Sequence, residues 1–404
     1  MSAFEDLWSL DPRIDYLNHG AFGACPVAVL DRQAELRAHM EREPVQFLTR
    51  EMQPLMDGSR AALGELLNVS PGDLALITNA TAGVNTVLRS LERDWGEGDE
   101  ILVTNMGYNA CNNAARYVAE RSGASVVEAE IKLPIQHENE VLEAVCDALS
   151  ERTRIAIIDH VTSGTGLIFP LEELITLVKS RDALVLIDGA HAPGMFPLDI
   201  ESLGADFYTG NCHKWLCAPK GAGFLWVKPR FQDRIAPLVI SHGWNTPREG
   251  RSRFSDVMDW PGTLDPTAWA CIADAIQFLS GLFPGGIEAL MKRNRDVVLQ
   301  GRRLLIERLG TQTVAPETMI GSLATVFLPD DPSAEPELDW ASTPTPTLRL
   351  QRQLFERYAI DLPMFPLPRH PKRGFRISAQ AYNEVEQYER LADALEVLLG
   401  EEES

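Results

Sequence analysis

Two residues in the middle of the chain have the types and the spacing for chemistry on an amine. Asp188 ends an apolar run that begins at Leu184, and Lys214 follows a second apolar segment at 205–208. Short apolar runs bounded by Gly and Pro are typical of strands that are buried on both faces of a parallel sheet. Functional groups of such sheets lie just beyond the carboxyl ends of the strands. We therefore expect Asp188 and Lys214 to lie near each other at one edge of a sheet.

This pair has the groups that pyridoxal phosphate requires. The cofactor forms a Schiff base with a lysine, and an acid beside its ring nitrogen keeps the ring protonated, so that the ring accepts electrons from a substrate carbanion. Taken alone, the pair is better explained as a buried Asp–Lys ion pair in an ordinary α/β domain. The sequence around the pair is what favours the cofactor.

Several motifs along nearly the whole chain share one family pattern. They are YLNHG at 16–20, NATAGVN at 79–85, DHVTS at 159–163, DGAH at 188–191, ADFYTGNCHKWL at 205–216, PKGAGFLWV at 219–227 and FRIS at 375–378. Together they resemble the class V aminotransferase family of pyridoxal phosphate enzymes, and the nearest branch looks like the isopenicillin N epimerase-like proteins.

The resemblance and the apolar pattern predict an α/β fold of the type I pyridoxal phosphate class. We expect an N-terminal arm at 1–25, a large cofactor-binding domain at 26–265 with a mostly parallel seven-stranded type of sheet between helices, and a smaller α+β C-terminal domain at 266–404. The pattern predicts strands over 74–78, 100–104, 125–127, 155–159 and 374–378, helices over 287–309, 348–358 and 383–399, and a surface loop over 329–346.

The resemblance also implies roles around the cofactor ring. Lys214 holds the cofactor and moves the substrate α-proton, Asp188 pairs with the ring nitrogen, and His191 contacts the ring hydroxyl. Tyr108 matches the position of a side chain that stacks on the ring, where many relatives carry His. A Tyr half-buried at a strand end is the simpler alternative for that residue.

On the phosphate side, the resemblance implies His213, with Asn211 as a further candidate. Thr81 and Ala82 follow the predicted strand 74–78, at the start of a helix whose free N–H groups and positive dipole end suit an anion. Thr263 matches a residue that reaches the phosphate of the neighbouring subunit, which implies a homodimer with a shared active site.

The substrate side is expected to hold Arg376, because a guanidinium grips an α-carboxylate with two parallel hydrogen bonds. Asn18 and His19 belong to an opening loop that lines the substrate side in the family, and a plain turn explains them equally well. His160 follows the strand 155–159 and could reach the substrate or the cofactor hydroxyl, although a lone His is more often structural.

These residues are suited to remove the α-proton from an amino acid. Three alternatives stay open for the second half of the reaction. Return of the proton to the opposite face gives epimerisation, which the nearest branch favours. Expulsion of a β substituent gives C–S lyase chemistry, and protonation of the cofactor gives transamination. A desulfurase with a cysteine on a late loop is disfavoured because no cysteine follows Cys271. A non-enzymatic scaffold is disfavoured because Lys214 and Asp188 are both kept.

Composition limits the partners. The formal net charge of −21, from 58 acidic and 37 basic residues, repels nucleic-acid backbones. No apolar run approaches the roughly 20 residues of a membrane span, and the N-terminus has no secretory pattern. The six cysteines complete no zinc-ligand spacing, so we expect no metal and a reduced, cytoplasmic location. The expected partner is a small amino-acid substrate.

Overall fold

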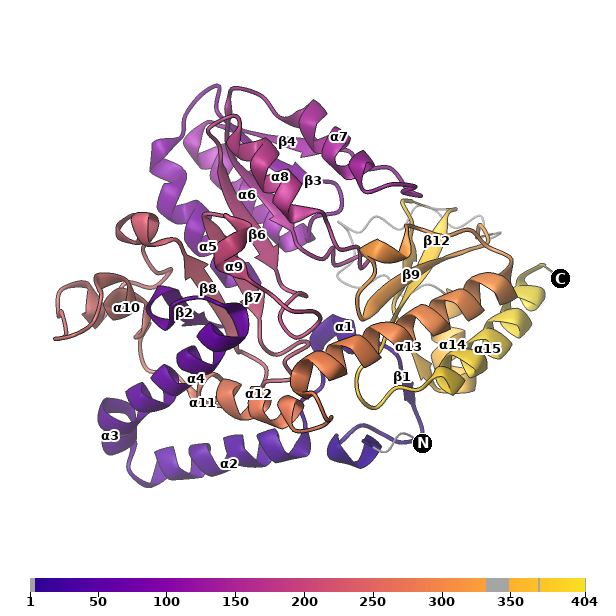
Figure 1. Ribbon diagram of the computed structural model, residues 1–404, viewed down its shortest axis with the longest axis horizontal. Coiled ribbons are helices and arrows are strands. Elements are labelled where there is room, and N and C mark those ends of the chain that lie inside the picture. Colours follow the sequence, from indigo (N-terminus) through magenta and orange to yellow (C-terminus); the bar gives the residue numbers. More distant parts are fainter. Residues whose placement is uncertain (1–3, 332–348, 370, 404) are drawn as a thin grey trace.

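The computed structural model describes residues 4–331, 349–369 and 371–403 (Figure 1). Its largest element is a seven-stranded sheet with the order β2-β8-β7-β6-β5-β3-β4. The strands are β2 (Leu74–Ile77), β3 (Glu100–Thr104), β4 (Ser125–Ala129), β5 (Thr153–Asp159), β6 (Leu184–Gly189), β7 (Phe207–Asn211) and β8 (Gly223–Val227). The pairs from β4 to β7 are parallel, while β8 runs antiparallel to both β7 and β2. The predicted α/β fold with a mostly parallel sheet is confirmed.

The central strands are apolar on both faces because helices cover both faces. Ile155 and Leu186 belong to a core shared with α5 (Ala80–Leu91) and α6 (Asn109–Ser122). Ile158 and its neighbours on the opposite face pack with α7 (Asn139–Ala148) and α8 (Leu171–Lys179). Since successive side chains of a strand point to opposite faces, this pattern fixes which face each later residue occupies.

The sheet changes direction between β3 and β5. The chain runs from β3 outward to β4, then crosses back and adds β5, β6 and β7 on the other side of β3. Open α/β sheets bind their ligands at such a switch point, beyond the carboxyl ends of the strands. The parallel strands β3, β5, β6 and β7 all end at this edge.

A second, three-stranded antiparallel sheet has the order β11-β12-β9, with β9 at Leu323–Leu328, β11 at Met364–Pro366 and β12 at Arg373–Ser378. The long helix α13 (Gly286–Leu309) packs on β9 and beside the closing helix α15 (Val385–Glu403), as the orange and yellow ribbons of Figure 1 show. The short strand β1 (Asp15–Tyr16) pairs with β10 (Ile360–Asp361), so the N-terminal arm is tied to this second part. Helix α14 spans Arg349–Tyr358.

Further helices occur along the described chain. They are α1 (His19–Phe22), α2 (Val27–Arg42), α3 (Pro44–Gln46), α4 (Met52–Leu67), α9 (Ile200–Leu203), α10 (Arg253–Met258), α11 (Thr267–Ala270) and α12 (Ile272–Ser280).

The predicted strands agree with the structure within a few residues, except that β7 runs on past the apolar segment 205–208 to Asn211. Its polar end still pairs with β6 and β8, which keeps it in the sheet. The predicted surface loop over 329–346 lies, from residue 332 on, outside the described residues. Within the described ranges no helix is both long and apolar enough to cross a membrane. The boundaries of the predicted domains stay a prediction.

Candidate active site

Asp188 lies near the end of β6 on the face that α6 covers, and it is almost completely buried. Its Oδ1 accepts the Ala190 N–H at 3.0 Å, and its Oδ2 accepts the Cys111 thiol at 3.0 Å. Burial raises the pKa of Asp188, while these hydrogen bonds and the charge of Lys214 lower it. No cation of the described residues forms an ion pair with this carboxylate. Asp188 is therefore a buried acid that can still take a positively charged partner.

Lys214 lies in the loop after β7, next to β6 in the sheet, so the predicted neighbourhood of the two residues is observed. Its Nζ lies 2.8 Å from Nε2 of His191, which follows β6. Burial lowers the pKa of Lys214 to about 7, the charge of Arg376 lowers it as well, and Asp188 raises it. A lysine of this kind holds a large fraction of neutral amine near pH 7, and the neutral amine is the form that attacks a carbonyl.

Arg376 on β12 is buried at the join between the two sheets, and it donates from Nη1 to the carbonyl oxygen of Ser163. Burial lowers the pKa of Arg376 to about 10. Among the described residues no carboxylate forms an ion pair with this guanidinium. A buried guanidinium without an anion is costly, so the arrangement suits a substrate that brings its own carboxylate.

The start of α5 offers a place for a phosphate. Asn79 caps the helix by accepting the Ala82 N–H at 2.9 Å, and Asn211 at the end of β7 accepts the Ala80 N–H at 2.8 Å. In the described part of the chain, neither the hydroxyl nor the N–H of Thr81 has a hydrogen-bond partner. Thr81 is thus the free donor of this turn, whereas the amide of Ala82 is already bonded and Asn211 holds the start of the helix in place.

Three further predicted residues border this region or lie outside it. His213 bonds the Ala222 carbonyl oxygen through Nδ1 at 3.0 Å, which leaves its Nε2 open, and burial lowers its pKa to about 4. Tyr108 precedes α6 and is half exposed. Burial raises the pKa of its hydroxyl, and the nearby Cys111 and Asp188 raise it further. Thr263 is exposed on the surface, in the segment after α10.

The structure does not bring His160 to this site. Asp159 is in register with Asp188, so the next residue, His160, points to the opposite face of the sheet. There its Nδ1 lies 2.9 Å from the Tyr208 hydroxyl, its ring packs edge-on against Phe196, and burial lowers its pKa to about 3. These contacts are those of a structural histidine.

His19 connects the lysine loop to the second part of the chain, and Asn18 contacts that second part. His19 is fully buried, with Nδ1 2.7 Å from the Tyr382 hydroxyl and Nε2 3.1 Å from the Lys214 carbonyl oxygen. It therefore holds the backbone of the lysine loop. Asn18 donates to Asp361 at 3.3 Å, and its Oδ1 is buried without a partner in the described part of the chain. That oxygen is free to accept from a bound molecule.

Three residues of the site had no predicted role. Cys111 donates to Asp188, and Trp215 donates to Nδ1 of His191 at 3.4 Å. Asp159 lies beside Asp188. Burial raises the pKa of Asp159, and the charge of Asp188 raises it further. The backbone N–H of Tyr108 acts on Asp159 in the opposite direction and lowers its pKa. Asp159 and Trp215 lie inside the family motifs, which is a signal for their importance, but contacts between helix and strand are not readable from spacing.

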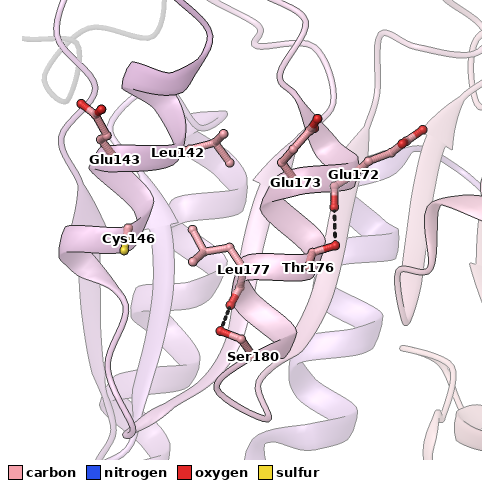
Figure 2. Close-up of a pocket in the computed structure, with 8 residues that line it drawn as sticks. All are labelled: Leu142, Glu143, Cys146, Glu172, Glu173, Thr176, Leu177 and Ser180. Carbon is pink, nitrogen blue, oxygen red and sulfur yellow. Dashed lines mark hydrogen bonds between the residues drawn. The ribbon is translucent and has the colours of Figure 1, made fainter.

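A shallow, open surface groove lies elsewhere. It runs between α7 and α8 on the outer surface of the molecule (Figure 2), lined by Leu142, Glu143, Cys146, Glu172, Glu173, Thr176, Leu177 and Ser180. None of these residues belongs to the strand ends described above. The chemistry of the chain is therefore located by its charged groups and not by this groove.

The groups present fit pyridoxal phosphate. A buried acid without a cation can meet the ring nitrogen, and an amine with a lowered pKa can bond the aldehyde. The free donors of Thr81, at a helix start, can meet the phosphate. Each of these groups lies at the same edge of the large sheet.

Comparison with known proteins points to the same cofactor. The family model for class-V aminotransferases matches residues 16–326. Isopenicillin N epimerase of Streptomyces clavuligerus is 34% identical over 404 residues, covering 97% of this chain and 96% of that protein. A probable chloroplastic L-cysteine desulfhydrase of Arabidopsis thaliana is 30% identical over 411 residues, covering 96% of this chain and 84% of that protein. The solved structure of the cystine C–S lyase C-DES, in complex with cysteine persulfide, superimposes with a TM-score of 0.79 at 22% identity, over 95% of this chain and 97% of that one. The chain belongs to the class-V aminotransferase family of pyridoxal phosphate enzymes.

Proposed function

We propose that this enzyme is an amino-acid epimerase of the isopenicillin N epimerase type. The observation that carries the proposal is the 34% identity to such an epimerase over almost the full length of both chains. The site supplies what removal of an α-proton needs, namely a base at Lys214 and an anchor for the α-carboxylate at Arg376.

Pyridoxal phosphate, when bound, withdraws electrons from the α-carbon of an amino acid and so acidifies its α-proton. The residues of the chain do the rest. Arg376 holds the carboxylate, which fixes the direction in which the α-proton points. Lys214 Nζ takes that proton as a neutral amine, and His191 orients the amine from 2.8 Å. Asp188 holds a positive ring nitrogen in place.

The second face needs a proton donor of its own. His160 lies on the wrong face of the sheet, and His19 is fully bonded, so Tyr108 is the candidate that remains of the three. Its side chain is half exposed at the strand edge where the substrate is expected. We propose that Tyr108 stacks on the ring and that its hydroxyl faces the second side of the α-carbon.

The cysteines support an epimerase over an enzyme that transfers sulfur through a nucleophilic cysteine. Five of the six are buried, and the exposed one, Cys146, lines the outer groove between α7 and α8. Cys111 is the cysteine in contact with Asp188, and burial together with Asp188 raises the pKa of its thiol far above the ordinary value. Such a thiol is not a nucleophile near pH 7.

A C–S lyase is the second candidate, because L-cysteine desulfhydrases are also among the relatives. Heavy water separates the two. We expect incubation with isopenicillin N in deuterium oxide to place deuterium at the α-carbon and invert part of the substrate with its side chain intact. Release of pyruvate and sulfide from L-cysteine, with no deuterium washed into recovered isopenicillin N, would assign the lyase reaction instead.

We also propose a homodimer and a cytoplasmic location. Thr263 is exposed after α10, and the nearby segment exposes Leu238, Val239, Ile240 and Trp244. Such an apolar patch marks an interaction surface, and a second copy would place Thr263 near a neighbouring site. Sedimentation equilibrium tests the dimer, with about twice the 44.8 kDa of one chain expected, and cell fractionation tests the location.

A further inference from the structure

The imidazole of His191 has a different kind of partner on each nitrogen. Nε2 lies 2.8 Å from Lys214 Nζ, and Nδ1 accepts the indole N–H of Trp215 at 3.4 Å. An indole N–H is a donor only. In this contact Nδ1 must therefore carry a lone pair, and the proton of a neutral imidazole must be on Nε2.

His191 is held neutral, so the position of its one proton decides what it can do. Burial lowers its pKa far below the ordinary value, and the charges of Lys214, Arg376, His19 and His213 lower it further. With the proton on Nε2, the ring is a hydrogen-bond donor on the side where Lys214 lies. With the proton on Nδ1, the same side would only accept.

Trp215 is well suited to impose this choice because its side chain is buried and closely packed. Its side chain is fully buried in a small apolar cluster with Val161, Ala192, Met195 and Leu323. Its ring lies 5.0 Å from that of His19, centroid to centroid. The direction of the indole N–H is thus set by packing and by the lysine loop itself.

We infer that Trp215 is a positioning residue that locks His191 as its Nε2–H tautomer, so that His191 donates a hydrogen bond to the ring oxygen of the cofactor. This inference rests on the proposed placement of pyridoxal phosphate at Lys214. A fixed donor stabilises the ionised ring oxygen, and that form absorbs at longer wavelength than the protonated one.

Trp215→Phe keeps an aromatic ring and removes the N–H. The Nδ1 atom of His191 then loses its hydrogen-bond partner, so the Nε2–H tautomer is no longer favoured and both tautomers become populated. Part of the hydrogen bond from Nε2–H to the ring oxygen is lost. We expect the ratio of the long-wavelength to the short-wavelength band of the bound cofactor to fall by about threefold to tenfold, the size of one lost hydrogen bond. Trp226→Phe, at a buried Trp of β8, is the matched control and should leave the ratio unchanged.

The decisive test repeats Trp215→Phe in a His191→Ala background. No imidazole is left there to orient, so Trp215→Phe should have no further effect on the bands. An equal effect in both backgrounds would show that Trp215 acts through packing alone and would overturn the inference. Unchanged bands in Trp215→Phe with His191 present would overturn it as well.

A second measurement needs neither the cofactor nor a folded Trp215 variant. The ¹⁵N spectrum of the histidine-labelled, cofactor-free chain, with His191 assigned by its loss in His191→Gln, should show the Nε2–H tautomer. An Nδ1–H signal would overturn the inference. Failure of the chain to bind pyridoxal phosphate would defeat the proposed function, yet this spectrum would still report which tautomer of His191 is present in the wild-type chain.

Discussion

Replacing Arg376 by Lys tests how the substrate carboxylate is held. The guanidinium is buried and, within the described residues, has no anion of its own, and one of its nitrogens is engaged by the Ser163 carbonyl oxygen. A lysine offers a point charge in place of a planar fork. At this depth it also becomes partly neutral, because burial already lowers the pKa of nearby Lys214 to about 7.

The expected loss follows from these two effects. One charge-assisted hydrogen bond is worth about 1.5–3 kcal/mol, and partial loss of charge adds to it. We expect a loss of transition-state stabilisation of about 2–4 kcal/mol, so that kcat/KM falls roughly 30-fold to 1000-fold, with a higher KM and a lower kcat. The assay is the initial rate of α-deuterium incorporation into the substrate, measured over a range of substrate concentrations.

The matched control is Arg373→Lys on the same strand. Arg373 is equally buried but is paired with Glu402 and bonds the Pro329 carbonyl oxygen, so its replacement should lower stability and leave kcat/KM nearly unchanged. A value of kcat/KM for Arg376→Lys within about threefold of the wild type, in a folded protein, would refute the role of Arg376 as the carboxylate anchor.

Four further outcomes are expected. Asp188→Ala should lower kcat by about 100-fold or more and leave the protein folded, and near-normal turnover would mean that another acid serves the ring nitrogen. Cys111→Ala should lower kcat by about threefold to tenfold because the thiol hydrogen bond to Asp188 is lost. Cys111→Ser should keep most of the wild-type kcat, and equal losses in both variants would contradict that role of the thiol. The rate at which cofactor-free enzyme captures pyridoxal phosphate should rise with pH through a midpoint of about 7 and then level off, because Lys214 reacts only as the neutral amine. Stopped-flow absorbance measures this, and a rise that continues to pH 10 would contradict the lowered pKa. Ile240→Asp should dissociate the proposed dimer in sedimentation experiments and weaken cofactor binding, and an unchanged mass would remove the exposed segment from the proposed interface.

The meeting of Asp188 and Lys214 was predictable because parallel strands end at a common edge. Both residues follow short apolar runs, and adjacent runs of this kind usually become adjacent strands. Arg376 was predictable only through the family pattern, since its strand is in a different sheet and no spacing rule connects it to Lys214.

Other features depend on register and packing, which the sequence does not display. His160 follows Asp159 directly, and the alternation of a strand sends the two to opposite faces. Only the pairing of Asp159 with Asp188 reveals which face is the reactive one. The contact of Cys111 with Asp188 likewise needs the distance between α6 and β6, and that of Trp215 with His191 needs the shape of the loop after β7.

The central claim is that Lys214 carries pyridoxal phosphate at the edge of the large sheet. Borohydride reduction of the enzyme with bound cofactor, followed by proteolysis and mass spectrometry, locates the attachment directly. We predict that the cofactor mass is found on the peptide that contains Lys214, and that Lys214→Ala abolishes it. Attachment at Lys220 or Lys228 in the wild-type enzyme, or a labelled peptide that persists in Lys214→Ala, would contradict this claim.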